Sequence, residues 1–140
     1  MTEERKHLQD IIYLKEAKVH SELSYCEKKK VAAFLVKNNR TIANGINGRV
    51  SGAPNVCEGA DGKTLWETIH AESNAIISVA ASTQSTEGAT MYITCAPCKD
   101  CSKLIVQAKV VRVVYAENYK DLDGVDFLRK HGVVVEKIEI

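Results

Sequence analysis

The chain has 140 residues, of which 45% are hydrophobic and 26% charged, with a formal net charge of +1. This length and composition predict a single folded domain over residues 1–140 and exclude a disordered chain. The near-neutral charge argues against a basic surface for long nucleic acid, and no apolar stretch is long enough for a membrane span. The charged start, Met1–Lys6, has no apolar core behind it, so we expect a cytoplasmic protein without a secretory signal.

The first half of the chain predicts one helix followed by a β-hairpin. Residues 3–22 have the periodicity of an amphipathic helix. The apolar run Val31–Val36 is typical of a buried strand, and Asn38-Asn39 is typical of a turn that leads into a second strand at Thr41–Ala43. The apolar face of the expected helix consists of Leu8, Ile11, Ile12 and Val19.

A glycine-rich segment separates the hairpin from the rest of the chain. Residues 44–64 hold five of the eight glycines, which predicts a long irregular loop of the kind that usually serves function. Helices and strands then alternate, and the complete order α-β-β-α-β-α-β-α-β predicts a three-layer α/β/α domain with a mixed five-stranded sheet. The elements expected after the loop are helix 70–81, strand 90–94, helix 98–108, strand 110–116, helix 122–131 and strand 133–138.

The cysteines indicate metal chemistry rather than disulfide bonds. Their number is five, and an odd count in a chain without a signal argues against a disulfide framework. Cys95, Cys98 and Cys101 fall within seven residues, and we expect Cys95 to face the core. Cys98 and Cys101 lie one turn apart at the start of an expected helix, whose positive end favours thiolates.

A third metal-binding side chain, His70, opens another expected helix. Two thiolates and one imidazole suit tetrahedral zinc, and three protein ligands leave a position open, as in catalytic sites. Zinc lowers the pKa of water in that position to about 7. Glu72 can take the proton from this water and return it to a leaving group. The sequence therefore predicts one catalytic zinc per chain on His70, Cys98 and Cys101, with Glu72 as the catalytic acid and base.

Each motif is weak by itself, but the combination is specific. A lone Cys-x-x-Cys also occurs in redox proteins, and a lone histidine at a helix start is usually a cap or a core residue. His-x-Glu followed after a strand by Pro-Cys-x-x-Cys is a known signature of zinc deaminases that act on nucleobases. This pairing disfavours a thioredoxin-like redox site.

The chain resembles the cytidine and deoxycytidylate deaminase superfamily over nearly its whole length, and within it the short phage enzymes that act on dCMP. The resemblance implies that His70, Cys98 and Cys101 bind zinc and that Glu72 moves protons. It also implies that the Ala71 N–H binds a pyrimidine oxygen, and that Asn47 and Tyr119 contact the sugar. The stretches that carry it are His70–Ile76, Glu87–Tyr92, Pro97–Ile105 and Val111–Ala116 with Tyr119 and Asp121.

The implied reaction is hydrolytic deamination of dCMP to dUMP, which supplies thymidylate synthesis. We expect the basic run Lys28–Lys30 either to be solvated or to supply Lys28 or Lys30 as a partner for the 5′-phosphate. The family resemblance also implies a homo-oligomer, up to a hexamer. No membrane and no long nucleic acid are expected as partners.

The glycine-rich loop departs from the family pattern. The chain has Ile46 and Val50 where relatives usually have tyrosine and proline, and it adds Arg49. Many relatives are regulated through this loop by a nucleoside triphosphate, accompanied by Mg²⁺. Isoleucine cannot stack as tyrosine does, valine leaves the loop freer than proline, and arginine can grip a phosphate. We therefore expect weakened or altered regulation.

Cys26 and Cys57 match positions that hold an extra structural zinc in some phage relatives. Two cysteines are too few ligands, and no histidine lies between Cys57 and His70, although His7 and His20 are possible substitutes. We therefore expect free buried thiols here rather than a second zinc.

Other functions remain open from the sequence. One is a deaminase of a different substrate, such as free cytidine, dCTP or adenine in tRNA. Enzymes of the free-nucleoside type usually have cysteine in place of His70, and the tRNA type usually has a basic surface, which argues against both. Another is a zinc-stabilised binding module without turnover, for which Glu72 would have no use.

Overall fold

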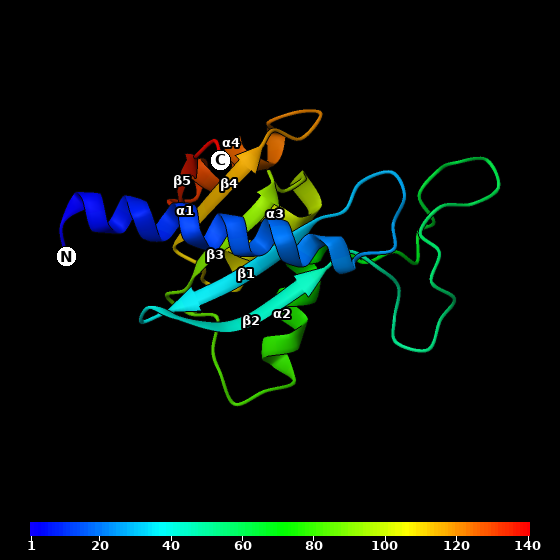
Figure 1. Ribbon diagram of the computed structural model, residues 1–140, viewed down its shortest axis with the longest axis horizontal. Helices are drawn as coiled ribbons and strands as arrows, with labels where there is room; N and C mark the ends of the chain where they lie inside the picture. Colours follow the sequence, from blue (N-terminus) through cyan, green and yellow to red (C-terminus); the bar gives the residue numbers. More distant parts are fainter.

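The computed structural model describes residues 1–140 and has helices on both faces of a mixed five-stranded sheet, as the sequence predicts (Figure 1). Boundaries differ from the expected ones by a few residues. None of the helices combines the length and the apolarity that a membrane crossing requires. The elements are α1 Glu3–His20, a 3-10 turn Ser21–Leu23, β1 Ala32–Lys37, β2 Arg40–Ile46, α2 Ala71–Ala80, β3 Thr90–Cys95, α3 Lys99–Gln107, β4 Arg112–Glu117, α4 Asp123–Lys130 and β5 Val134–Lys137.

The sheet has the strand order β2-β1-β3-β4-β5. Strand β1 runs antiparallel to both β2 and β3, whereas β3, β4 and β5 are parallel to one another. The expected turn at Asn38 and Asn39 is confirmed. Both residues have positive φ (53° and 60°), as the type I′ turn of a two-residue hairpin requires. Because β3 and β4 are parallel, the turns that follow both strands lie at the same end of the sheet.

The two faces of the sheet carry separate hydrophobic clusters. Helices α2, α3 and α4 cover one face, where Leu35, Met91 and Ile93 belong to a cluster of 17 buried residues. Helix α1 covers the other face, where Phe34 and Val114 belong to a cluster of eight. Alternating side chains of the same strands thus fill both layers of the core.

The face that α1 presents to the sheet differs from the expected one. The buried residues of α1 are Asp10, Leu14 and Ala17, whereas Leu8, Ile12 and Val19, three members of the expected apolar face, are exposed by 46%, 45% and 69%. A buried ion pair explains the difference. Both oxygens of Asp10 accept hydrogen bonds from Arg112 (2.9 and 2.6 Å), and Oδ1 also accepts one from the Tyr92 hydroxyl (2.7 Å). Rotating the other face of α1 inward would leave these charges unpaired.

The long loop is confirmed, but it runs from Asn47 to His70 because β2 continues to Ile46. An isolated bridge between Gly48 and Ile69 closes its neck, and its remaining residues project beyond one end of the sheet (Figure 1). The loop therefore leaves and re-enters the fold at nearly the same place, next to the start of α2.

Two glycines allow helices to approach the backbone closely. A Cβ atom at Gly45 in β2 would lie 2.5 Å from both the Ala71 oxygen and the Ala75 nitrogen of α2. A Cβ atom at Gly124 in α4 would meet the Pro97 oxygen and lie 2.8 Å from the Cys98 carbonyl carbon. These approaches fix α2 against the sheet and fix the turn before α3 against α4.

We predict that Gly124→Ala destabilises the protein by about 1–3 kcal/mol, because the added methyl group overpacks the contact with Pro97 and Cys98. At an unobstructed helical position the same change normally stabilises by up to about 1 kcal/mol. Urea unfolding of the two proteins measures the difference, and its sign distinguishes the two cases. A stabilised variant would show that α4 does not need this close approach.

Candidate active site

The side chains of the predicted metal site come from two helix starts. His70 is the N-cap residue of α2 and Cys98 is the N-cap residue of α3, and neither makes a side-chain capping hydrogen bond. Cys101 lies in the first turn of α3 and is buried. Both helices thus have a metal-binding side chain at the N-cap position, where serine, threonine or aspartate normally accepts a hydrogen bond from a backbone N–H of the first turn.

The three side chains converge at distances that fit zinc. The Nδ1 atom of His70 lies 3.5 Å from the Cys98 sulfur and 3.3 Å from the Cys101 sulfur. All three ligand atoms lie within 4.8 Å of one another. In tetrahedral zinc sites, nitrogen and sulfur ligands are separated by about 3.6 Å, so small shifts would accommodate the ion. The donor set of one imidazole and two thiolates also fits.

The surroundings of the Cys98 sulfur favour a thiolate, whereas the hydrogen bond with Cys98 and burial raise the pKa of the Cys101 thiol. The Cys101 thiol and, after it, the His70 ring hydrogen-bond to Cys98 and lower the pKa of the Cys98 thiol to about 4. The Ser73 hydroxyl lies 3.5 Å from the Cys101 sulfur. Cys98 therefore offers zinc a ligand in the deprotonated form that the metal requires.

Glu72 lies in the first turn of α2, beside His70, Cys98 and Cys101, which we call the metal group. Its side chain is buried, with 4% exposure, and it takes part in none of the ion pairs of the molecule. Burial raises the pKa of this carboxyl to about 7 in the metal-free protein. A carboxyl group of this kind can both accept and return a proton near neutral pH.

A cavity of about 170 Å³ brings the predicted residues together. His70, Glu72 and Cys98 line it, as do the three residues expected at the substrate: Asn47, Ala71 and Tyr119. Ala71 is the first residue of α2, where a helix leaves N–H groups without an intrahelical acceptor.

The Asn47 side chain has a structural role at the entrance to β1. Its amide accepts a hydrogen bond from the Val31 N–H (2.9 Å) and donates one to the Lys29 oxygen (2.7 Å). An asparagine amide has two hydrogens and two lone pairs, so one of each remains for a ligand. Asn47 therefore also fixes the backbone that enters β1.

The basic run contributes two lysines to the cavity. Lys28 and Lys29 line it, whereas Lys30, one of the two lysines expected at the phosphate, does not. The ammonium group of Lys29 lies 3.2 Å from Glu117 at the end of β4. Lys28 takes part in no ion pair, so its charge is free for an anion.

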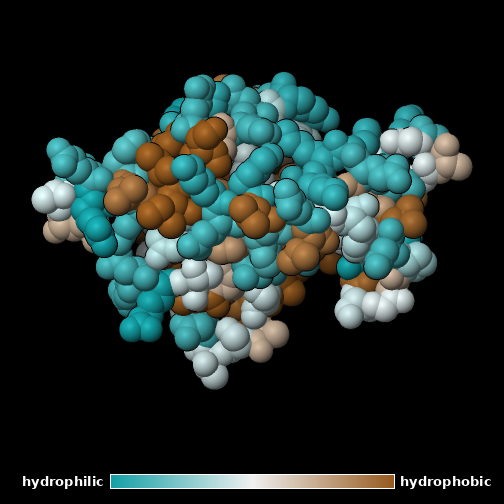
Figure 2. All heavy atoms as spheres, in the orientation of Figure 1, coloured by the Kyte–Doolittle hydropathy of each residue, from teal (hydrophilic) through white to brown (hydrophobic).

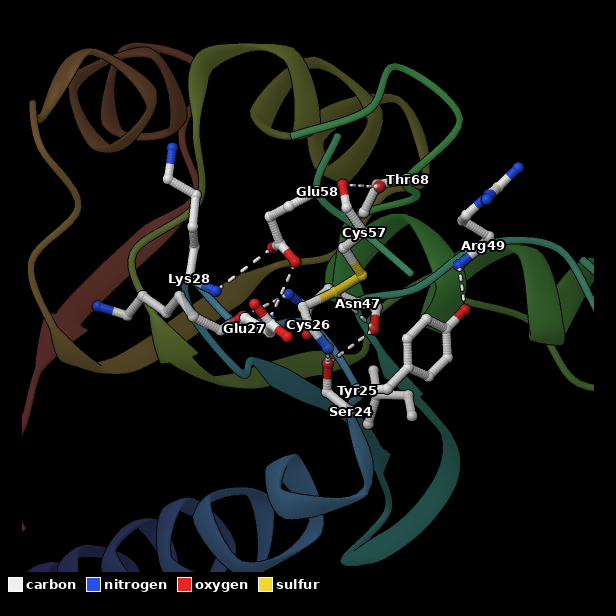
Figure 3. The surroundings of a disulfide bond; sticks show 12 residues. Ser24, Tyr25, Cys26, Glu27, Lys28, Asn47, Arg49, Cys57, Glu58 and Thr68 are labelled. Atoms are coloured by element: carbon white, nitrogen blue, oxygen red, sulfur yellow. Dashed lines mark hydrogen bonds between the residues drawn. A yellow bond between two sulfur atoms is a disulfide. The ribbon is translucent and has the colours of Figure 1, made fainter. Parts of the chain in front are cut away.

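The expectation of free thiols at Cys26 and Cys57 is wrong. The two residues, 31 positions apart, form a disulfide bond, and both are buried (Figure 3). The odd cysteine count obscured this pair, because Cys98 and Cys101 belong to the metal group and Cys95 alone remains. Cys95 is buried, as expected, and lines the same cavity.

The residues that depart from the family pattern lie around the neck of the loop. Ile46 ends β2, Val50 is 62% exposed, and the Arg49 guanidinium lies 3.3 Å from Glu67. The backbone N–H of Arg49 donates a hydrogen bond to the Tyr25 hydroxyl at 2.7 Å. Altered regulation, and Mg²⁺ with a nucleotide effector, stay predictions.

Three supporting side chains were not singled out from the sequence. Asn74 of α2 donates to the Ile46 oxygen (2.8 Å) and so fixes the helix to the end of β2. Glu58 accepts hydrogen bonds from the backbone N–H groups of Glu27 (3.1 Å) and Lys28 (3.3 Å). Thr68 donates to the Cys57 oxygen at 3.2 Å. Only Asn74, adjacent to the His-x-Glu motif, had a sequence signal.

Comparison with known proteins agrees with this geometry. The profile of the cytidine and deoxycytidylate deaminase zinc-binding region matches residues 7–117. The chain belongs to the cytidine and deoxycytidylate deaminase family. The zinc-binding region of the family covers the metal group, Glu72 and most of the cavity, so zinc is the metal that this site takes.

The similar proteins include several deoxycytidylate deaminases. ComE operon protein 2 of Bacillus subtilis is 38% identical over 123 residues, which cover 84% of this chain and slightly less than two thirds (64%) of that protein. Deoxycytidylate deaminase of Enterobacteria phage T4 is 33% identical, with 82% of each chain covered. The structure of dCMP deaminase from cyanophage S-TIM5 in complex with dCMP and dUMP is 42% identical, covers 99% of both chains and has a TM-score of 0.91.

We predict that Cys98→Ala and Cys101→Ala each lose most of the bound zinc, because two ligands hold the ion far more weakly than three. Elemental analysis of the purified variants measures the metal content. Cys95→Ala is the matched control, since it removes a buried thiol of the same cavity that is not part of the metal group. Full zinc retention in both ligand variants would refute the assignment.

Proposed function

We propose that this protein is a zinc-dependent hydrolase that converts dCMP and water to dUMP and ammonia. The observation that carries the proposal is the buried carboxyl of Glu72 next to the three-ligand metal group, in the same cavity as Lys28 and Lys29. The likeness to the cyanophage dCMP deaminase over 99% of both chains supports the same substrate.

His70, Cys98 and Cys101 would hold the zinc ion, which supplies Lewis-acid activation of the attacking water when bound. Glu72 accepts a proton from that water and delivers it to the departing amino group, so one residue serves as base and then as acid. Its burial keeps bulk water from competing for these protons.

Groups around the cavity would orient the nucleotide. The free N–H of Ala71 binds the pyrimidine oxygen, and Asn47 and Tyr119 contact the sugar. Lys28 and Lys29, which line the same cavity, contact the 5′-phosphate by charge-assisted hydrogen bonds. The base is thereby placed over Glu72, and the charged end of the substrate lies at the lysines.

Other substrates of the same chemistry have weaker support. The structure of a tRNA A34 deaminase is only 21% identical in sequence to this chain, so its similarity shows the fold alone. A net charge of +1 does not suit a tRNA partner, whose phosphates attract basic surfaces. A module without turnover would have no use for a buried carboxyl beside the metal group.

The proposal includes association of identical chains. The exposed side of α1 and of the 3-10 turn after it carries a row of apolar side chains, Leu8, Ile12, Val19 and Leu23. Figure 2 shows apolar atoms gathered on this face of the molecule. A second copy of the chain would remove this row from water. Sedimentation equilibrium measures the oligomeric state directly.

We predict that Glu72→Gln retains zinc and the fold but loses deamination of dCMP by roughly 10²–10⁴-fold or more, because general acid–base groups contribute that much and this one acts twice. Ammonia release measures turnover, and elemental analysis shows that the metal is retained. Glutamine keeps the size of the side chain, so a folding defect is not expected. Near-normal turnover would mean that another group moves the proton.

We predict that dCMP is preferred to deoxycytidine and that Lys28→Ala removes much of the preference. Loss of a charge-assisted phosphate contact costs about 1.5–3 kcal/mol, or roughly 10- to 100-fold in kcat/KM. Lys30→Ala is the matched control, because this neighbouring lysine does not line the cavity. Equal kcat/KM values for the two substrates in the unaltered enzyme would contradict the assignment of the phosphate end.

A further inference from the structure

The disulfide bond joins two segments that form one wall of the substrate cavity. Cys26 precedes the lysines at the entrance to β1, and Cys57 lies in the long loop (Figure 3). Both sulfur-bearing side chains line the cavity that contains His70 and Glu72. Both residues are almost completely enclosed, with exposures of 2% and 0%. The mechanism proposed above does not use them.

Few other contacts hold this part of the loop to the lysine segment. Glu58, next to Cys57, accepts the N–H groups of Glu27 and Lys28 (Figure 3). Closer to the neck, the Arg49 N–H donates to the Tyr25 hydroxyl. Between the bridge at Gly48 and the disulfide, the loop has no regular secondary structure. The disulfide bond is therefore the strongest connection between the lysine segment and the loop at Cys57.

We propose that Cys26 and Cys57 are a reversible thiol–disulfide site that couples substrate binding to the redox state of the protein. The inference rests on the proposed function for its effect on dCMP, whereas the bond itself does not. In reducing compartments, disulfides are usually transient or redox-sensing rather than structural. When the bond is intact, it ties the segment before Lys28 to the loop at the cavity. When it is broken, Glu58 is the remaining contact from the Cys57 side of the loop, and Asn47 holds only the backbone that follows Lys28.

The reductant is a small thiol, such as glutathione or a dithiol. A thiolate attacks one sulfur through a mixed disulfide, and a second thiol of the reductant releases it. The bond between Cys26 and Cys57 breaks, two electrons and two protons pass to the protein thiols, and the reductant leaves as its own disulfide. Oxidation by a disulfide of the same class reverses each step.

Both cysteines line the substrate cavity, so we expect an external thiol to reach the bond from there. A nucleotide in the cavity should therefore slow the attack of an external thiol. Thermodynamic linkage adds a reciprocal effect: if reduction weakens nucleotide binding by some factor, the nucleotide resists reduction by the same factor. The two effects can be measured independently, one on the thiols and one on the substrate.

The same sulfurs offer a competing chemistry. Cys26, Cys57 and Glu58 place three ligand atoms within 4.8 Å, so reduced sulfurs could hold a metal ion instead. Zinc on these residues would protect the thiols without any disulfide, and a second zinc per chain is therefore one of the results that would overturn the proposal.

The first experiment counts thiols in the zinc-loaded enzyme, purified without reductant and then denatured with a chelator. We expect three reactive thiols per chain, since Cys95, Cys98 and Cys101 are free, and five after reduction by a phosphine. We also expect dUMP to slow the appearance of the last two thiols during reduction by glutathione. Five thiols without reductant, or two zinc ions per chain, would overturn the proposal.

The second experiment compares steady-state kinetics of the oxidised and reduced enzyme. We expect reduction to raise KM for dCMP about tenfold, the lower end of the loss of one charge-assisted contact, while kcat changes less than about twofold. The double variant Cys26→Ser and Cys57→Ser should match the reduced enzyme and ignore the reductant. If this variant does not fold, the comparison of KM between the oxidised and the reduced wild-type enzyme is sufficient to test the coupling.

The outcomes separate this proposal from the proposed function. Suppose that the enzyme does not deaminate dCMP and that dUMP does not change the rate of reduction, although three thiols are found before reduction and five after it. This result would refute the proposed function and the coupling together. Deamination of dCMP with the same KM in both redox states would refute only the coupling. Zinc content, measured in both states, shows that the phosphine has left the catalytic metal in place.

Discussion

The placement of the metal group depends on two positions where a helix and a backbone segment approach more closely than any side chain would permit. Gly45 lets α2 lie against β2, and Gly124 lets α4 lie against the turn at Pro97. His70 directly precedes Ala71, which Gly45 meets, and the Cys98 backbone is itself in the contact with Gly124. A shift of either helix by the width of a methyl group would separate ligands that now lie 3.3 to 3.5 Å apart.

The chemistry and the recognition of substrate reside in parts of the fold with different rigidity. The metal-binding side chains and Glu72 stand on helices that are packed on the sheet by the larger hydrophobic cluster. The lysines and Asn47 belong to segments outside regular structure or at its edge. In such an arrangement the reacting centre is held rigidly, whereas the segments that contact the rest of the substrate tolerate change more readily.

Sequence patterns predicted the elements because their signals are local. They predicted the metal group because its ligands fall in two short motifs, although His70 lies 28 residues from Cys98. The Pro-Cys-x-x-Cys spacing is set by one helical turn, and the strands are short apolar runs bounded by turns. The face of α1 could not be predicted, since a partner 102 residues away, Arg112, draws Asp10 inward against the apolar pattern. The bond between Cys26 and Cys57 was missed for a similar reason: the loop that brings them together has no periodicity from which its course can be inferred.

The closed neck of the loop has a consequence for how this fold changes during evolution. Because the Gly48–Ile69 bridge fixes both ends, residues can be added or removed between them without moving β2 or α2. Doubling the length of a flexible loop costs only about 0.6 kcal/mol in closure entropy. The segment is thus a place where whole insertions are tolerated, and new binding surfaces can arise there while the ancestral reaction continues.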